Sequence, residues 1–410
     1  MSSSKPVHAP QTWFPVVDDC LQVGGIALTR LAQRIGGTPF YAYDRARLTA
    51  RVAELREHLP PRLALHYSIK ANPMPALVQH MAGLGDGLDV ASGGEMSVAL
   101  DTGMAPAQIS FAGPGKSEAD LARALAAGVC VNIESAREVT LLARLSQKMG
   151  VASNAVLRVN PDFELRSSGM KMGGGAKQFG VDAEQAPALM GQAAASGVVV
   201  HGLQIFSGSQ SLKADAIMEA QSQALQLALR LGADAAAPFS FINIGGGFGI
   251  PYFPGEQRLE LAPIGVHLTH LQRKLEAALP EARLAIELGR YLVGEAGVYV
   301  ARVIDRKVSR GEVFLVTDGG LHHHLAASGN FGQVIRKNYP VAVGSRMTPA
   351  GLSASVVGPL CTPLDLLAER MDLGQAQVGD LVVVFQSGAY GASASPAAFL
   401  GHPTVREALV

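Results

Sequence analysis

Eight short apolar runs, rich in β-branched residues, alternate with helix-like segments along much of the chain. They lie at residues 64–70, 87–92, 109–113, 129–135, 154–161, 198–206, 239–247 and 283–289. Strands that alternate with helices form right-handed β-α-β units and hence a parallel sheet. Eight units in about 225 residues match the strand number and size of a closed (β/α)8 barrel of the TIM type. We therefore expect an α/β fold with such a barrel over residues 37–290, and an open doubly wound sheet is the alternative.

The pattern changes after residue 290. The segments YLVGEAGVYVARVIDRKVSRGEVFLVTDGG and DLVVVFQSGAYG indicate strands joined by turns, with few helical patterns between them. We expect a mostly antiparallel β-domain over residues 291–410. Residues 1–36 contain a short β-like stretch and the amphipathic segment LTRLAQRIGG. This pattern suits packing on either domain, and we expect the segment to pack with the β-domain.

Composition narrows the class of protein. The 410 residues include 34 basic and 34 acidic side chains, a balance that offers no basic stripe for nucleic acid and no polybasic patch for a membrane. The three cysteines, Cys20, Cys130 and Cys361, are far apart and odd in number, which excludes a disulfide framework and fits a reducing compartment. No apolar run reaches the roughly 18 residues of a membrane span. We expect a cytoplasmic enzyme with no nucleic-acid or membrane partner.

Polar residues collect at the predicted carboxyl ends of the barrel strands, where the active sites of such barrels lie. They are Lys70, Asp89, Arg158, Ser209, Glu287 and Arg290. After the seventh run, Gly245, Gly246 and Gly247 leave backbone N–H groups unshielded and able to bind an anion. Barrel enzymes commonly bind phosphate with the loops after strands seven and eight, where Arg290 also falls, and Ser209 adds a hydroxyl. We predict a phosphate site; a glycine turn needed only for tight packing is the alternative.

Lys70 and Glu287 indicate the rest of the ligand. In HYSIKANP, Lys70 alternates with Ser68 and His66, so its side chain is expected to point into the barrel, where a desolvated amine becomes a nucleophile. A solvated lysine beyond the strand end is the alternative. An amine that faces a phosphate site suggests a phosphorylated aldehyde cofactor, and the carboxylate of Glu287 suits the nitrogen of a pyridine ring.

Eight motifs follow one another in a recognisable order: HYSIKANP, GLDVASGGE, LRVNPD, GSQ, NIGGGFG, GRYLV, GPLC and SGAYG. In these motifs the chain resembles the fold-type III pyridoxal-phosphate decarboxylases, which include diaminopimelate, ornithine and arginine decarboxylases. The resemblance covers roughly residues 37–400 and implies an alanine-racemase-like barrel followed by a β-domain. Within the family, the chain is most similar to the exosortase A system-associated pyridoxal-dependent decarboxylases.

The resemblance implies that pyridoxal 5'-phosphate is the cofactor and that an amino acid loses carbon dioxide by way of an external aldimine and a quinonoid. It places Lys70 at the cofactor aldehyde and Glu287 at the pyridine nitrogen. It makes Cys361 a catalytic residue donated across a homodimer with shared active sites, although without the family an inert buried thiol would be the better interpretation. The further cofactor contacts that we expect are Asp89, Arg158, Phe206, Ser209, Gly245, Gly246, Gly247, Arg290 and Tyr390.

Three departures from the family concern the substrate and the ring face. Phe206 stands where relatives carry a histidine, and its ring can stack but cannot donate a hydrogen bond. Thr362 follows the cysteine, where diaminopimelate and ornithine decarboxylases have an acidic residue that meets the distal amino group. The Arg-Pro-x-x-Tyr stretch of diaminopimelate decarboxylases is replaced around LHHHLAAS. The amino acid therefore stays open, and the residues that we expect near it are His323, His324, Thr362 and Asp365.

Two alternative functions and one alternative site remain. Racemases of this fold place an arginine at the ring nitrogen, so Glu287 favours decarboxylation over racemisation. A non-catalytic pyridoxal-phosphate-binding regulator would lose Lys70 or Cys361, and both are present. The run His322–His324 is not expected to hold a metal, because adjacent residues do not face one ion and no cysteine or carboxylate cluster accompanies them.

Overall fold

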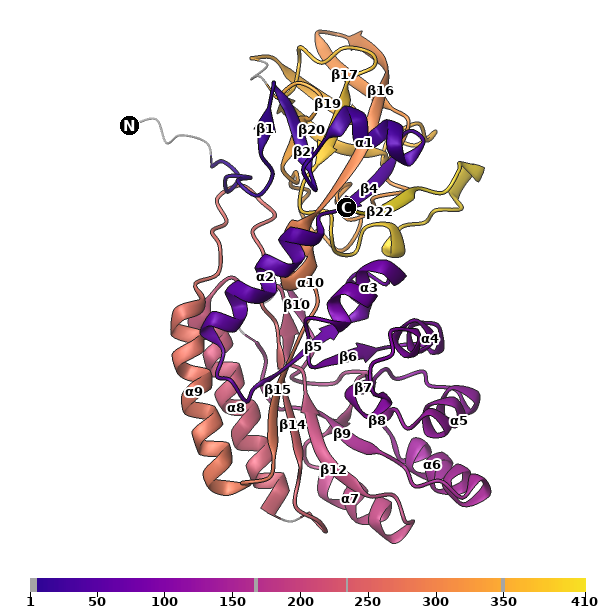
Figure 1. Cartoon of the computed structure of the whole chain (residues 1–410), viewed down its shortest axis with the longest axis vertical. Coiled ribbons are helices and arrows are strands. Elements are labelled where there is room, and N and C mark those ends of the chain that lie inside the picture. The colour runs from indigo at the N-terminus through magenta and orange to yellow at the C-terminus, as the bar shows by residue number, and fades with distance from the viewer. Residues whose placement is uncertain (1–5, 166–168, 234, 348–350) are drawn as a thin grey trace. The chain divides into compact units, whose positions relative to one another are not determined.

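The computed structural model describes residues 6–165, 169–233, 235–347 and 351–410. The chain forms two compact units, whose elements are labelled in Figure 1. The barrel unit comprises Arg51–Ile250 and Leu259–Gly289. The β-unit comprises the described residues up to Ala50, together with Pro251–Arg258 and Arg290–Val410. Helix α2 (Arg45–His58) carries the chain from the β-unit into the barrel unit.

The barrel unit contains a closed ring of eight parallel strands. In spatial order these are β5 (Ala64–Ser68), β6 (Gly87–Val90), β7 (Ile109–Phe111), β8 (Cys130–Ile133), β9 (Ala155–Asn160), β12 (Val200–Ile205), β14 (Phe241–Gly246) and β15 (Arg283–Leu288). Pairing of β8 with β9 and of β15 with β5 closes the ring. Each strand lies within one of the eight predicted runs, so the barrel is confirmed over the open sheet.

Helices follow the strands in sequence and surround them in Figure 1. They are α3 (Pro75–Ala82), α4 (Gly93–Asp101), α5 (Glu118–Ala127), α6 (Ala136–Met149), α7 (Ala186–Ala195), α8 (Ala214–Ala233) and α9 (Leu261–Ala278). Ser92, Ser117 and Ser135 each accept a backbone N–H three residues on and so begin α4, α5 and α6. Within the described ranges, every helix is too short or too polar to cross a membrane.

Short elements complete the carboxyl ends of the barrel strands. They are the 3-10 turn η1 (Ile69–Ala71) after β5, the ribbon of β10 (Met170–Lys171) with β13 (Gly208–Ser209), and β11 (Val181–Asp182) beside β9. Ser209 therefore lies in a two-stranded ribbon and not in the barrel wall itself.

The β-unit is built on strands that run in both directions. They are β4 (Phe40–Tyr43), β16 (Gly297–Ser309), β17 (Glu312–Thr317), β18 (Val341–Val343), β19 (Ser353–Val357), β20 (Leu366–Asp372), β21 (Leu381–Val384) and β22 (Arg406–Leu409). The central strand β16 pairs antiparallel with β17, β21 and β4. The pairs β18–β21 and β19–β20 are also antiparallel, and among the described strands of this sheet only β17–β19 and β22–β4 are parallel. The prediction of a mostly antiparallel sheet is confirmed, with two parallel pairs that make it mixed.

The N-terminal segment packs on this sheet. It contains β1 (Val16–Val17), β2 (Cys20–Val23), β3 (Ile26–Ala27) and α1 (Leu28–Ile35). The buried side chains of β2 and α1 form one apolar cluster with residues of β4, β16 and β21. Burial of this apolar stripe is what fixes the segment to the β-unit.

The compact units divide the chain differently from the expected domains. Strand β4 falls within the range 37–290 assigned to the barrel, yet it pairs with β16 and β22 of the β-unit. The range Pro251–Arg258 also belongs to the β-unit. The pattern of apolar residues in a segment can predict a strand. It does not predict which sheet the strand joins, because pairing depends on residues far away in sequence.

Candidate functional site

Lys70 lies just beyond the first barrel strand. Strand β5 ends at Ser68, and Lys70 occupies the middle of turn η1 with its side chain exposed. The expectation that it continues the strand into the barrel interior is therefore corrected, because the extended backbone ends two residues earlier. Its Nζ lies 5.6 Å from the centroid of the Phe206 ring, which follows β12. The amine is thus accessible and stands beside an aromatic face.

Glu287 projects from β15 and is buried. Its Oε2 accepts hydrogen bonds from Gln204 Nε2 at 2.5 Å and from Asn243 Nδ2 at 2.8 Å. Burial and then the charge of Asp89 raise the pKa of Glu287, whereas Lys70 and the hydrogen bond from Gln204 act in the opposite direction. Neither amide was singled out from the sequence.

Asp89 on β6 pairs with a buried histidine. Its Oδ1 lies 3.0 Å from His66 Nδ1, and its Oδ2 accepts a long hydrogen bond of 3.5 Å from Ser68 Oγ. Burial acts to lower the pKa of His66, but the charge of Asp89 and its hydrogen bond outweigh this effect, so the pKa is raised. The expected cofactor contact Asp89 is therefore already engaged by His66, and its charge acts on Glu287.

Arg158 on β9 belongs to a buried ion network. Its NH1 donates to Glu134 Oε1 at 3.0 Å, and Lys116 Nζ lies 3.7 Å from the same oxygen. Glu134 Oε2 also accepts the Gly180 N–H at 2.9 Å. Burial acts to raise the pKa of Glu134, but the cations Arg158 and Lys116 hold it below its usual range. This network fixes Arg158 at the carboxyl end of its strand.

The glycine turn after β14 leaves no room for side chains. A Cβ on Gly246 would lie 2.1 Å from the backbone oxygen of Glu287, and Gly245 and Gly247 adopt φ values of 74° and 81°. The Gly245 N–H already donates to Asn243 Oδ1 at 2.9 Å. Of the three amides predicted to bind phosphate, this one is therefore engaged within the protein.

Arg290 begins α10 (Arg290–Val293) in the β-unit, where two tyrosines hold it. Its guanidinium lies 5.4 Å from the Tyr252 ring centroid and 4.5 Å from that of Tyr390, and NH1 donates to Tyr252 Oη at 3.0 Å. Burial opposes the charge, but Tyr252 and Tyr390 raise the pKa of Arg290. Arg290 Nε is buried without a hydrogen-bond partner in the described chain. Tyr390 has a φ of 53°, a costly conformation that often marks functional sites.

Cys361 lies on an exposed loop between β19 and β20 of the β-unit. Asp365 fixes this loop, because its buried carboxylate accepts the Leu321 N–H at 2.6 Å and the Leu360 N–H at 2.8 Å. The structure thus gives Asp365 a role in joining two loops, and its expected substrate contact stays a prediction. Burial raises the pKa of this carboxyl group.

Thr362 closes the turn that carries Cys361. Its N–H donates to the Leu360 carbonyl at 2.8 Å, and its Oγ1 accepts the Leu364 N–H at 3.3 Å. The side chain is half-buried and brings no charge to the neighbourhood of the cysteine. An acidic residue at position 362 would instead place a carboxylate beside the thiol of Cys361.

The histidine run is buried inside the β-unit. His324 Nε2 lies 2.9 Å from Ser387 Oγ and Nδ1 accepts the Ala327 N–H at 3.3 Å, and burial lowers the pKa of His324 to about 3. His323 Nε2 lies 2.8 Å from the Pro403 carbonyl. The structure gives both residues partners within the β-unit, and their expected substrate contacts stay predictions. Among the described residues, no group of three or more metal-ligating side chains is placed to hold an ion.

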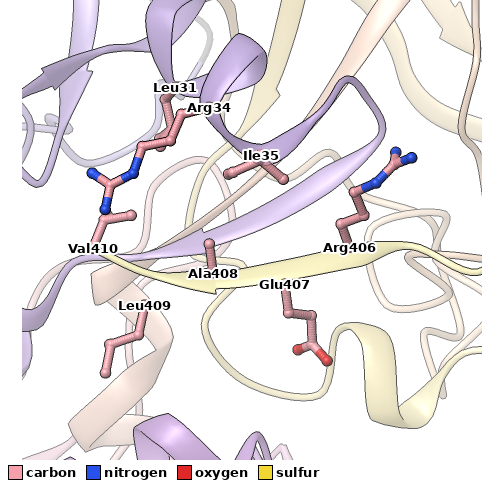
Figure 2. A pocket seen from close by; sticks show the side chains of 8 residues that line it. All are labelled: Leu31, Arg34, Ile35, Arg406, Glu407, Ala408, Leu409 and Val410. Atoms are coloured by element: carbon pink, nitrogen blue, oxygen red, sulfur yellow. The ribbon is translucent and has the colours of Figure 1, made fainter.

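A groove of about 490 Å³ lies between α1 and β22, as Figure 2 shows. It is lined by Leu31, Arg34, Ile35, Arg406, Glu407, Ala408, Leu409 and Val410. None of the predicted catalytic or cofactor residues lines it.

Within each unit, the structure brings predicted residues together with others that sequence reasoning missed. The barrel unit groups Lys70, Phe206 and Glu287, and the β-unit groups Arg290 with Tyr390. The missed residues carried weak signals. Gln204 lies two residues before Phe206 and thus on the same strand face, and Asn243 lies two residues before the glycine turn.

The residues of the barrel unit fit pyridoxal phosphate. Lys70 offers an accessible primary amine, and Phe206 offers an aromatic face beside it. Glu287 has one oxygen, Oε1, with no hydrogen bond from the described residues, as an acceptor for a protonated ring nitrogen requires. Gly245 and Gly247 adopt positive φ values, as in turns whose backbone N–H groups cradle a phosphate.

Comparison with known proteins gives a consistent result. The family model described as the pyridoxal-binding domain of pyridoxal-dependent decarboxylases matches residues 45–294. The chain is 36% identical to the L-glutamyl-(BtrI acyl-carrier protein) decarboxylase of Niallia circulans, over 93% of this chain and 90% of that protein. It is 32% identical to the diaminopimelate decarboxylase of Pseudomonas aeruginosa, over 92% of this chain and 89% of that protein.

A solved structure shows the same architecture. The Helicobacter pylori diaminopimelate decarboxylase in complex with L-lysine superposes with a TM-score of 0.83 at 26% identity, over 93% of this chain and 94% of that one. The match extends over both units in sequence and is not confined to the barrel. On these grounds the chain belongs to the pyridoxal-dependent decarboxylase family.

Proposed function

We propose that this enzyme, a pyridoxal-phosphate-dependent amino-acid decarboxylase, acts on an amino acid whose distal end carries no free ammonium group. The observation that carries the proposal is the turn at Cys361, where uncharged Thr362 closes the loop. A carboxylate at this position would attract a distal ammonium group, and a hydroxyl gives no such attraction. The Niallia circulans relative, named for an L-glutamyl group on an acyl-carrier protein, supports a substrate whose far end is joined to a carrier.

The roles of this chain's residues follow from their chemistry. When bound, pyridoxal phosphate supplies the electron sink for the pair left behind as carbon dioxide departs. Lys70 would hold the aldehyde carbon through its accessible amine and exchange protons at Nζ. Glu287 would keep a proton at the ring nitrogen through Oε1. Cys361 would return a proton to the α-carbon from its exposed thiol.

Each unit by itself carries residues that suit an anionic group by their chemistry. In the barrel unit these are Ser209 and the amides of Gly246 and Gly247. In the β-unit it is Arg290, whose charge its two tyrosines sustain. The buried and unpartnered Nε of Arg290 supports its assignment to an anionic ligand.

We also propose that the enzyme works as a homodimer. Apolar side chains are exposed near the cysteine loop, and Phe331, Val334 and Leu364 are 39%, 100% and 58% exposed. Asn330 Nδ2 donates to the Leu364 carbonyl at 3.3 Å, so the loops that carry them are joined. A contiguous exposed apolar patch is typical of a surface that a second chain covers.

Two finer assignments rest on the resemblance and on the thiols. We place the chain in the subgroup associated with the exosortase A system, which it resembles most within the family. We place it in the cytoplasm, because Cys20, Cys130 and Cys361 are all unpaired, as is usual for proteins of a reducing compartment. Fractionation of the native host, with immunodetection of the protein, tests the location.

The substrate proposal is tested by carbon dioxide release from a panel of amino acids. The panel pairs free L-glutamate, meso-diaminopimelate and L-ornithine with L-glutamate joined at its distal carboxyl group to pantetheine as a thioester. We expect kcat/KM for the tethered substrate to exceed that for each diamino acid by at least about tenfold, because a site without a distal carboxylate gives the ammonium group no partner. Faster turnover of meso-diaminopimelate or ornithine than of the tethered substrate would overturn the proposal.

A further inference from the structure

Two amide side chains donate to the same oxygen of Glu287. Gln204 Nε2 and Asn243 Nδ2 both end on Oε2, at 2.5 Å and 2.8 Å. All three residues are buried, with exposures of 2%, 1% and 6% in the order Gln204, Asn243 and Glu287. They project from three adjacent strands, β12, β14 and β15, so barrel pairing fixes their spacing.

Each amide is itself oriented by a further hydrogen bond. Gln204 Oε1 accepts Asn132 Nδ2 at 2.5 Å, and Asn132 Oδ1 accepts Ser110 Oγ at 3.1 Å. The donors therefore run in one direction, from Ser110 through Asn132 and Gln204 to Glu287. A reversed Gln204 amide would place its oxygen against Glu287 Oε2 and its NH2 group against the NH2 group of Asn132, so the NH2 group of Gln204 is fixed toward the carboxylate.

Asn243 links the carboxylate to the glycine turn. While its Nδ2 donates to Glu287, its Oδ1 accepts the Gly245 N–H at 2.9 Å. Gly245 has a φ of 74°, a conformation that needs glycine. One buried side chain thus joins the group expected at the ring nitrogen to the turn expected at the phosphate.

The electrostatic surroundings of Glu287 explain why it needs the two hydrogen bonds from Gln204 and Asn243. Burial and the nearby Asp89 carboxylate raise the pKa of Glu287 and so favour its neutral form. An ionised carboxylate accepts a hydrogen bond from a protonated ring nitrogen more strongly than a neutral carboxyl group does. Hydrogen bonds to the charged form of Glu287 stabilise that form. Because both amides end on Oε2, the other oxygen is left for the ligand.

We propose that Gln204 and Asn243 are positioning residues that keep Glu287 ionised with Oε1 directed to the cofactor's ring nitrogen, and that Asn243 also aligns the glycine turn with this carboxylate. The inference rests on the proposed placement of pyridoxal phosphate in the barrel unit. It assigns a function to two residues that touch neither the cofactor aldehyde nor the substrate.

The protonation state of the cofactor's ring nitrogen can be measured directly. Holoenzyme is reconstituted with pyridoxal phosphate labelled with nitrogen-15 in the ring, and the nitrogen chemical shift is followed with pH alongside the dissociation constant of the cofactor. Gln204→Met removes one donor at similar volume, and Asn243→Asp removes the other donor but keeps the acceptor for Gly245. Gln221→Met is the matched control, because Gln221 is a buried amide on α8 outside this network.

We expect a protonated ring nitrogen in the wild type and in Gln221→Met at neutral pH. In Gln204→Met and Asn243→Asp the signal should shift toward the unprotonated form, and the dissociation constant should rise about tenfold or more, as for a lost hydrogen bond to a charged group. Asn243→Ala, which also frees the Gly245 N–H, should weaken cofactor binding beyond Asn243→Asp.

The two levels of the proposal fail in different ways. If Gln204→Met and Asn243→Asp leave the nitrogen signal of the wild type unchanged while Glu287→Gln alters it, the positioning roles are wrong and the placement of the cofactor stands. If Glu287→Gln also leaves the signal unchanged, or the wild type binds no pyridoxal phosphate, the placement itself is wrong and the inference falls with it. Should Gln204→Met not fold, Ser110→Ala and Asn132→Ala probe the same relay from further away, and a smaller shift in the same direction is then expected.

Discussion

The barrel unit and the β-unit hold their functional groups in different ways. Glu287 is buried under two amide donors that are themselves fixed by further hydrogen bonds. Cys361 lies exposed on a loop that is joined to other segments through the buried carboxylate of Asp365 and through the Leu364 carbonyl, which accepts Asn330 Nδ2. On the roles proposed above, the carboxylate at the cofactor is held rigidly inside the barrel unit, whereas the proposed proton donor lies on a surface loop of the β-unit.

The largest expected effect lies on the barrel side. Lys70→Ala should lower kcat by at least about a thousandfold, because no other accessible amine stands beside Phe206 among the described residues and proton transfer by a positioned group contributes about 10²–10⁴-fold. Carbon dioxide release and the visible absorbance of bound cofactor measure the change. Lys148→Ala, an exposed lysine on α6, is the control and should behave as the wild type. A Lys70→Ala enzyme with substantial turnover would remove the basis of the barrel assignment.

The next effect separates the β-unit from the barrel. Cys361→Ala should lower kcat about a hundredfold by removing the proton donor, yet leave the absorbance of the bound cofactor unchanged. Steady-state kinetics and a spectrum of the same sample measure both properties, with Cys20→Ala as the matched thiol control. Loss of cofactor absorbance in Cys361→Ala would show that the two halves are not independent.

Substrate choice should respond to the residue after the cysteine. Thr362→Asp introduces a carboxylate that can meet a distal ammonium group, so the ratio of kcat/KM for ornithine to that for the tethered glutamyl substrate should rise by about tenfold. Thr362→Ser keeps the hydroxyl that accepts the Leu364 N–H and is the matched control. An unchanged ratio in Thr362→Asp would place the distal end of the substrate elsewhere.

The smallest effect concerns stability of the β-unit against acid. Burial lowers the pKa of His324 from 6.5 to about 3, so the unfolded chain takes up this proton first as the pH falls. His324 therefore makes its full contribution to the free energy of unfolding at pH values above the pKa of a histidine in the unfolded chain. Below that pKa the contribution falls by about 1.4 kcal/mol per pH unit, because one proton is involved. Between about pH 6.5 and pH 5, the wild type should lose about 2 kcal/mol more of its unfolding free energy than His324→Gln does.

Urea unfolding at the two pH values measures this difference. His58→Gln, on α2, is the control and should keep the pH dependence of the wild type. Equal pH dependence in His324→Gln and wild type would mean that His324 is not held neutral in the fold.

The barrel could be predicted from the sequence because its signal is local and repeated. Each strand is a short apolar run, and serine caps and glycine ends mark the helices, as at Ser117 and Gly128 around α5. The sheet that β4 joins could not be predicted, since its pairing with β16 joins residues about 250 positions apart in sequence. The same holds for Pro251–Arg258, which lies in the β-unit although barrel segments flank it.

The residues of the site also fall into those that local sequence predicts and those that depend on distant segments. Lys70, Glu287 and the glycine turn could be predicted because they end predicted strands. The exposed position of Lys70 could not, because it depends on β5 ending at Ser68 and the backbone turning there. Gln204 and Asn243 have ordinary interior positions in the sequence, and only the closure of the barrel brings their amides to one carboxylate oxygen. The buried partners of Asp89, Asp365 and His324 likewise come from distant segments.

The most direct test follows the α-carbon of one substrate. Holoenzyme is mixed with the tethered glutamyl substrate, labelled with carbon-13 in its α-carboxylate, and labelled carbon dioxide and the configuration of the remaining substrate are measured together. We expect one carbon dioxide for each substrate consumed, no inversion of the remainder, and a strong loss of release in Glu287→Gln. Inversion at the α-carbon without carbon dioxide release, or release that Glu287→Gln leaves unchanged, would contradict a decarboxylase organised around this carboxylate.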